Sequence, residues 1–223
     1  MYRKFFSVTL ATVILFAASV HGQAAEKSAL DQARDALVAK DPDGAIKLVD
    51  PIIARADASD TKDADAICPG TAVALLGAFM ARQDPTFVIS TENDWCEAML
   101  LKGYALAELG KSEQASELLG KLVRFDPNNP NYLAEYAFVL QSTRKLDESM
   151  AFYKRVVNVS EKLSDKSAQR HWRAVGLRGI GFIHSDRQEW DDAVKAYKAS
   201  LKEEPDNKIA LGELLYIEQS RSK

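Results

Sequence analysis

The chain has 223 residues, of which 47% are hydrophobic and 27% charged, and its formal net charge is −3. This length and composition are those of a folded protein with its own core, and the slight acidic excess argues against binding to nucleic acid. Seven prolines and eleven glycines exclude a collagen-like or disordered chain, and two cysteines are too few for a Cys-rich zinc site.

The N-terminal segment, residues 1–25, is typical of a secretory signal peptide. Arg3 and Lys4 form a short basic head, residues 5–20 carry no charge, and small residues follow up to Ala25. The apolar stretch is shorter than the roughly 20 residues that a membrane span needs. We therefore predict cleavage, a periplasmic or secreted mature protein, and no stable membrane insertion. An uncleaved N-terminal anchor is the alternative.

Cys68 and Cys96 are the two cysteines of the chain. Because an even number of cysteines in an exported protein is typical of structural bridges, we expect a disulfide between them. A bridge that closes the loop between Cys68 and Cys96 is expected to stabilise the fold by roughly 3–4 kcal/mol. Free thiols and a redox-active pair are the alternatives, although redox pairs usually have closely spaced thiols.

The chain repeats itself with a period of about 34 residues. Tyr104 falls on Phe138 at this shift, and a further shift of 44 reaches Phe182, which places an insertion of ten residues between about 160 and 170. Each copy shows two amphipathic helices joined by a short polar break. Each unit is therefore a helix–turn–helix, and such units must stack to bury their apolar flanks.

Small residues recur twelve positions apart in every copy. This spacing brings them opposite each other in an antiparallel helix pair, and their size allows the two backbones to approach closely. Leu119, Tyr153 and Tyr197 are then expected to fill the space toward the next unit. The small pairs are Gly103 and Ala115, Ala137 and Ser149, and Gly181 and Ala193.

Three segments, residues 96–129, 130–163 and 174–207, carry one pattern of large, small and proline positions. The first segment carries it as Met99, Lys102, Gly103, Leu106, Ala115, Leu119 and Pro127. This pattern resembles the tetratricopeptide repeat family, with Lys102, Glu161 and His184 as departures. The resemblance implies an all-α fold, an α-solenoid of stacked helix–turn–helix hairpins.

The segments on either side of the three copies fit the pattern less well. Residues 26–95 are predicted to form divergent helical hairpins, with a degenerate copy at its start. Residues 208–223 are predicted to form a C-terminal capping helix. The apolar positions of that helix are Leu211, Leu214, Leu215 and Ile217.

No motif in the sequence points to a reaction. Lys111 belongs to a hairpin turn rather than a phosphate loop, because the glycine that such a loop needs is Ala105. His171 and His184 would lie more than about 130° apart around one helix, too far for a pair of metal ligands. We predict a structural role for His184, and a protein that is not an enzyme and holds no cofactor or metal.

The resemblance implies a concave groove lined by the first helices of successive units. Tyr104, Phe138 and Phe182 form an aromatic row there, which either anchors a bound segment or packs as core. Arg178 is the one cation among the predicted groove positions, so the carboxylate clamp of some relatives is not expected. The predicted groove residues are Leu100, Tyr104, Phe138, Gln141, Arg178 and Phe182.

The leading prediction is an exported adaptor that binds a protein or peptide segment in this groove. It would support the assembly or localisation of envelope or secreted proteins. The first alternative is a small-ligand-binding or enzymatic module with its site in residues 57–95. The second is a structural subunit held at the membrane by an uncleaved N-terminus.

Overall fold

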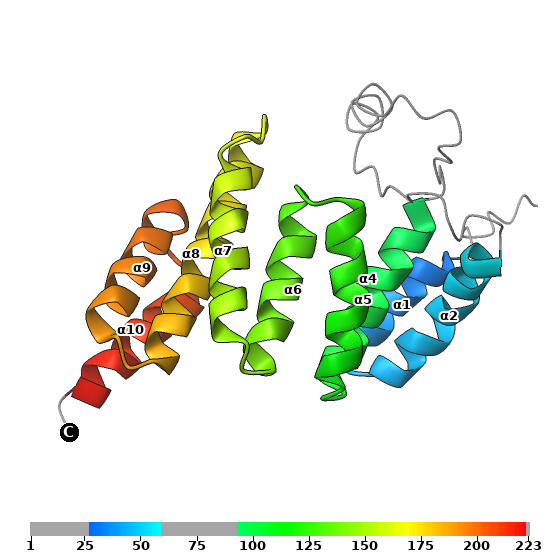
Figure 1. Ribbon diagram of the computed structural model, residues 1–223, viewed down its shortest axis with the longest axis horizontal. Coiled ribbons are helices and arrows are strands. Elements are labelled where there is room, and N and C mark those ends of the chain that lie inside the picture. Colours follow the sequence, from blue (N-terminus) through cyan, green and yellow to red (C-terminus); the bar gives the residue numbers. More distant parts are fainter. Residues whose placement is uncertain (1–26, 59–92, 222–223) are drawn as a thin grey trace, which may run out of the picture.

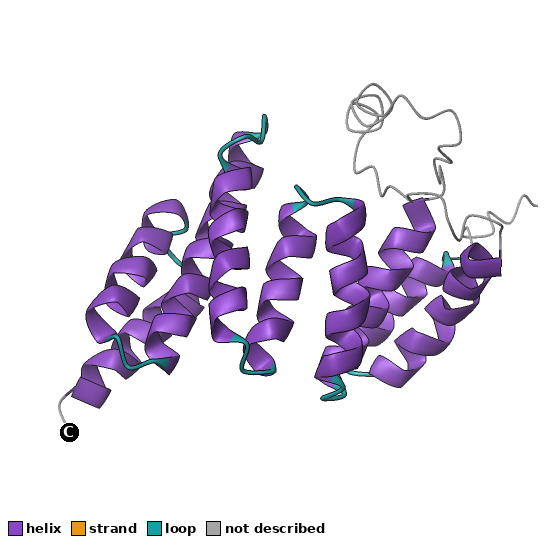
Figure 2. Ribbon diagram, viewed as in Figure 1, coloured by secondary structure: helices purple, strands orange, loops and turns teal. Residues whose placement is uncertain are grey.

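The computed structural model describes residues 27–58 and 93–221, and every regular element in these two ranges is an α-helix. The helices follow one another in a row, from blue α1 and cyan α2 to red α10 in Figure 1, and Figure 2 shows the loops between them. The predicted all-α class is confirmed. The helices are α1 (Ala29–Val38), α2 (Pro42–Ala58), α4 (Asn93–Glu108), α5 (Ser112–Phe125), α6 (Pro130–Ser142), α7 (Leu146–Ser160), α8 (Lys166–Asp186), α9 (Trp190–Glu203) and α10 (Lys208–Arg221).

Each described helix packs against the next described helix along the chain, from α1 on α2 to α9 on α10. The first helices of successive hairpins also meet, since α1 contacts α4, α4 contacts α6, and α6 contacts α8. The predicted stack of hairpins is confirmed by these contacts. Residues 59–92 separate α2 from α4 in the sequence, yet these two helices pack directly on each other.

Four hairpins share one turn, in which a single residue has a positive φ angle. These residues are Lys40 (62°), Gly110 (71°), Arg144 (63°) and Gln188 (60°). At Gly110 the turn is closed by two hydrogen bonds, from the Gly110 N–H to the Ala107 carbonyl at 3.0 Å and from the Lys111 N–H to the Leu106 carbonyl at 2.8 Å. The same pair of bonds recurs at the other three turns, so α1 and α2 form a hairpin of the same kind.

The small residues predicted at helix contacts lie in the interior. Ala115, Ala137, Ser149 and Ala193 have no exposed surface. A Cβ added to Gly103 would lie 2.6 Å from Leu119 Cδ2, and one added to Gly181 would lie 2.8 Å from Tyr197 Cε1. Leu119 and Tyr197 thus occupy the space beside the glycine of their own hairpin.

Tyr153 reaches the next hairpin, as predicted. Its ring and backbone lie against Gly179 and Gly176 in α8, where an added Cβ would collide with them. Because both glycines are buried, α7 and α8 approach closely along this contact.

The ten-residue insertion lengthens α8 toward its N-terminus. This helix begins at Lys166, eight residues before the predicted unit at 174, and the Asp165 carboxylate caps it by accepting from the Ala168 N–H at 2.6 Å. Arg173 in the added turns pairs with Glu161 at 2.5 Å and with Glu203 at 3.0 Å. The extension therefore ties the end of α7 to the end of α9.

Lys102, a departure from the repeat pattern, has a partner in the fold. Its ammonium lies 2.6 Å from Asp50 Oδ1, and the side chain is 29% exposed. The pair joins α4 to α2, so a charged residue at this apolar position is matched by an acid on the preceding hairpin.

The last helix, α10, packs on α9 through one face. Ala210 and Ile217 are buried there, whereas Leu211 (49%) and Leu215 (56%), two of the apolar positions of the predicted capping helix, are exposed. None of the helices in the described ranges is long and apolar enough to cross a membrane. The predicted signal peptide, residues 1–25, lies outside those ranges.

Candidate functional site

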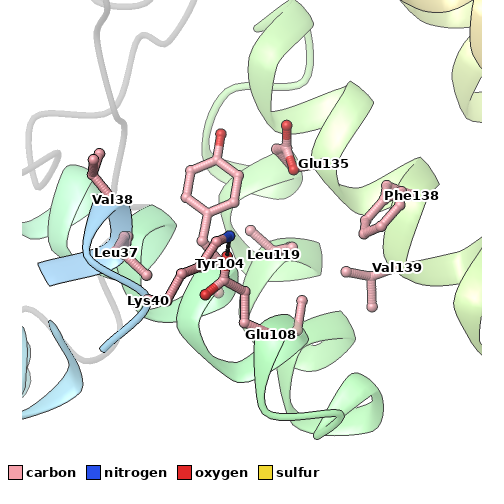
Figure 3. A pocket seen from close by; sticks show the side chains of 11 residues that line it. Leu37, Val38, Lys40, Tyr104, Glu108, Leu119, Glu135, Phe138 and Val139 are labelled. Atoms are coloured by element: carbon pink, nitrogen blue, oxygen red, sulfur yellow. Dashed lines mark hydrogen bonds and ion pairs between the residues drawn. The ribbon is translucent and has the colours of Figure 1, made fainter. Parts of the chain in front are cut away.

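A pocket of about 530 Å³ opens where the end of α1 meets α4 and α6 (Figure 3). Its walls are mostly apolar side chains, and its polar groups are a lysine, a tyrosine and two glutamates. The lining residues are Leu37, Val38, Lys40, Gly103, Tyr104, Ala107, Glu108, Leu119, Glu135, Phe138 and Val139.

Because of helical spacing, the lining residues of α4 lie on one face of that helix, and the lining residues of α6 lie on one face of α6. Ala107 and Glu108 lie three and four positions after Tyr104 on α4, and Phe138 lies three positions after Glu135 on α6, so each set projects from one side of its helix. Phe138 is 55% exposed, although it is a large apolar side chain. The pocket therefore offers an aromatic surface to a ligand.

Two of the polar groups at the pocket neutralise each other. The Lys40 ammonium lies 2.9 Å from Glu108 Oε1 and joins the first hairpin to α4. The Tyr104 hydroxyl donates to Asn131 Oδ1 at 3.2 Å. Burial raises the pKa of the Tyr104 hydroxyl far above its ordinary value, so this group stays protonated and can donate.

Glu135 is the second acid that lines the pocket, on the side of α6 that faces Tyr104 (Figure 3). Burial raises the pKa of Glu135 to about 7, although a hydrogen bond with the Tyr104 hydroxyl acts in the opposite direction. No ion pair joins its carboxylate to a residue in the described part of the chain. Near neutral pH the group therefore lies close to the midpoint of its ionisation.

The structure brings two of the predicted groove residues together, because Tyr104 and Phe138 line the same pocket. Leu100 is buried in the core, with 9% exposed. Gln141 is half-buried, and its amide donates to Asp186 Oδ2 at 3.5 Å. None of these placements tests ligand binding, which stays a prediction.

Phe182 and Arg178 on α8 have partners within the chain. The Phe182 ring packs edge-to-face on Tyr197 with 5.7 Å between centroids. Arg178 is 12% exposed and pairs with Glu204 at 2.5 Å. Burial alone would raise the pKa of Glu204, but hydrogen bonds from His171 and Arg178 outweigh it and hold the pKa below its ordinary value. The aromatic row is thus divided between a pocket at Phe138 and packing at Phe182.

Sequence reasoning missed Glu135 and the contribution of Leu37 and Val38. A signal for Glu135 was present, because it precedes Phe138 by three positions and so shares its helix face. The residues of α1 could not be found in this way, since their approach to α6 depends on how the first hairpin packs on α4.

The other candidate residues lie apart from the pocket. His184 is 21% exposed with Nδ1 at 2.5 Å from Glu189, while His171 pairs with Glu204. Within the described ranges, no three His, Cys, Asp or Glu side chains are grouped as metal ligands would be. Cys96 is buried, but Cys68 and most of residues 57–95 lie outside the described residues, so the disulfide and the alternative site there stay predictions.

Comparisons with known proteins agree with this architecture. Residues 97–129 match the tetratricopeptide repeat family. The MamA protein is 14% identical with a TM-score of 0.51, over 87% of this chain and 81% of that chain, which is a likeness of fold. No curated protein matches the sequence significantly.

Two further solved structures are similar at lower TM-scores. The first TPR of Spaghetti (RPAP3), bound to an HSP90 peptide, is 22% identical with a TM-score of 0.46, over 57% of this chain and 94% of that chain. A tetratricopeptide repeat protein from Parabacteroides merdae is 12% identical with a TM-score of 0.44, over 85% and 70%. The described part of the chain is an all-α array of TPR-like hairpins, with a tetratricopeptide repeat at residues 97–129.

Proposed function

We propose that this protein is an exported scaffold that holds a segment of another protein against its concave pocket. The observation that carries the proposal is Phe138, a large aromatic side chain that is 55% exposed and lines a pocket of about 530 Å³. Rigid aromatic side chains in a concavity are good anchors for a peptide or a helix. The tetratricopeptide repeat at residues 97–129 supports a scaffold role without a reaction of its own.

Export is part of the proposal and rests on the sequence of residues 1–25. The mass of the protein purified from its natural host tests it. We expect the mass to fall by that of an N-terminal peptide that ends between Gly22 and Ala25. An intact N-terminus would overturn the exported part of the proposal while leaving the pocket unaffected.

Partner capture tests the binding role. The immobilised protein and its Phe138→Ala variant are exposed to the envelope fraction, and retained proteins are identified by mass spectrometry. Leu215→Ala is a matched control, because Leu215 is 56% exposed but lies on α10, outside the pocket lining. We expect Phe138→Ala to lose the partner and Leu215→Ala to keep it. Equal capture by a folded Phe138→Ala variant would contradict the proposal.

A further inference from the structure

Glu135 differs from two other partly buried charges that face neighbouring helices. Lys102 pairs with Asp50 at 2.6 Å, and Arg178 pairs with Glu204 at 2.5 Å. Glu135 has no ion pair with a described residue. Because a carboxylate loses hydration when it is buried, such groups are usually paired or protonated. A positive charge supplied from outside would therefore be stabilised at this position.

The carboxylate of Glu135 keeps room for a donor. It interacts with the hydroxyl of Tyr104, which carries a single proton and also lies 3.2 Å from Asn131 Oδ1. A carboxylate has two oxygens and about four acceptor positions, so one hydroxyl cannot satisfy it. An ammonium or guanidinium group, which only donates, complements what is left.

The walls around Glu135 suit the stem of a basic side chain. Figure 3 shows Glu135 between the ring of Tyr104 and the ring of Phe138, and Val139 lies below Phe138 in that view. Lysine and arginine bury their methylene groups against apolar surface while the charged head finds a polar partner. Aromatic faces also attract a cation.

The charge balance of the pocket favours a cation over an anion. Lys40 is paired with Glu108 at 2.9 Å, so Glu135, when ionised, sets the sign of the charge at the centre. A terminal carboxylate brought to this position would be repelled by it, because like charges at close range are unfavourable.

From these contacts we propose that the pocket receives a lysine or arginine side chain of the bound protein segment, with the cationic head at Glu135 and the stem against Tyr104 and Phe138. This inference rests on the proposed function, since it names the chemistry of the segment that the scaffold would hold.

A peptide array tests the inference with the full purified chain. The probes are nonapeptides of mixed sequence whose central residue is lysine, arginine, norleucine or glutamate. Norleucine keeps the aliphatic stem of lysine and removes the charge. We expect the lysine and arginine sets to be retained at least fivefold more strongly than the norleucine and glutamate sets.

Two variants separate charge recognition from apolar binding. Glu135→Gln keeps the shape of the side chain, and it should bring the lysine and norleucine sets to equal retention. Glu148→Gln on α7 is the matched control, because Glu148 is exposed and lies outside the pocket lining, and it should behave as the parent protein. Circular dichroism confirms that each variant is folded.

The outcomes distinguish this inference from the proposed function. Retention of norleucine peptides as strong as that of lysine peptides, or a lysine preference unchanged by Glu135→Gln, overturns the basic-residue inference and leaves peptide binding standing. If the protein retains none of the four sets, both the inference and the proposed peptide-binding function fail.

Discussion

The hydroxyl of Ser149 donates a hydrogen bond of 2.7 Å to the backbone carbonyl of Ala137, and neither side chain has any exposed surface. The two residues lie twelve positions apart on α7 and α6, one of the pairs of small residues that the sequence repeats. At this pair the close approach of two helices can be seen as a direct contact between a side chain and the opposite backbone.

The Ser149 contact predicts different costs for two substitutions. Ser149→Ala removes one hydrogen bond and should lower the free energy of unfolding by about 1 kcal/mol. Ser149→Leu adds volume where α6 and α7 touch and should lower it by about 1–3 kcal/mol. Urea denaturation measures both values. A Ser149→Leu variant as stable as the parent would contradict the tight contact.

Three helical glycines form a matched series. Gly179→Ala and Gly181→Ala place a methyl group against the rings of Tyr153 and Tyr197, so each should lower the free energy of unfolding by roughly 1–2 kcal/mol. The methyl group added by Gly212→Ala has no neighbour within 4 Å. Because alanine has a better helix propensity than glycine, this substitution should raise the free energy of unfolding by up to about 1 kcal/mol. Thermal and urea unfolding would show the opposite signs, and a common sign for all three would refute the assigned contacts.

Ile217 and Leu215 test how α10 is attached. Ile217 is 1% exposed against α9, so Ile217→Ala should cost about 2–4 kcal/mol through the cavity it leaves. Leu215 is 56% exposed, and Leu215→Ala should change stability by less than about 0.5 kcal/mol. Urea unfolding compares them directly. Equal effects would mean that α10 presents another face to the array.

Glu135 predicts how stability depends on pH. Burial raises its pKa from an ordinary value of 4.5 to about 7 in the folded state, so the folded protein holds this proton more tightly than the unfolded chain. The contribution of Glu135 to the free energy of unfolding should therefore fall as pH rises from about 4.5 to about 7, and level off above that.

The Glu135→Gln variant isolates this contribution. Because glutamine does not ionise, the variant should gain roughly 1–3 kcal/mol over the parent at pH 8 and show little difference near pH 4. Urea unfolding at a series of pH values gives the difference between the two proteins. A difference that does not change with pH would show that Glu135 is not buried as described.

The repeat period predicted the hairpins well because it records contacts between helices. Gly103 and Gly181 marked positions where a neighbouring side chain needs space, and the structure places Leu119 and Tyr197 there. The start of α8 was not predictable in the same way, since an insertion has no counterpart in the other copies. Its N-cap, Asp165, gives a local signal, but the repeat pattern does not require a helix at that point.

The site was less predictable than the fold. Phe138 and Phe182 hold one register position, yet Tyr197 contacts Phe182, whereas the equivalent Tyr153 lies against Gly179 and leaves Phe138 55% exposed. The burial of Glu135 depends on how α1 and α4 pack beside α6. Such differences come from contacts between units, which the pattern within one unit does not contain.

The packing of each helix on its neighbours along the chain has an energetic consequence. Among the helices of residues 27–58 and 93–221, none contacts both the α1 of Leu30 and the α10 of Ile217, so the effects of substitutions at these two positions should add. The proposed binding region at α4 and α6 can then accumulate changes while the α9–α10 end keeps its own stability. An array of this kind allows its ligand preference to change separately from the elements that hold it folded.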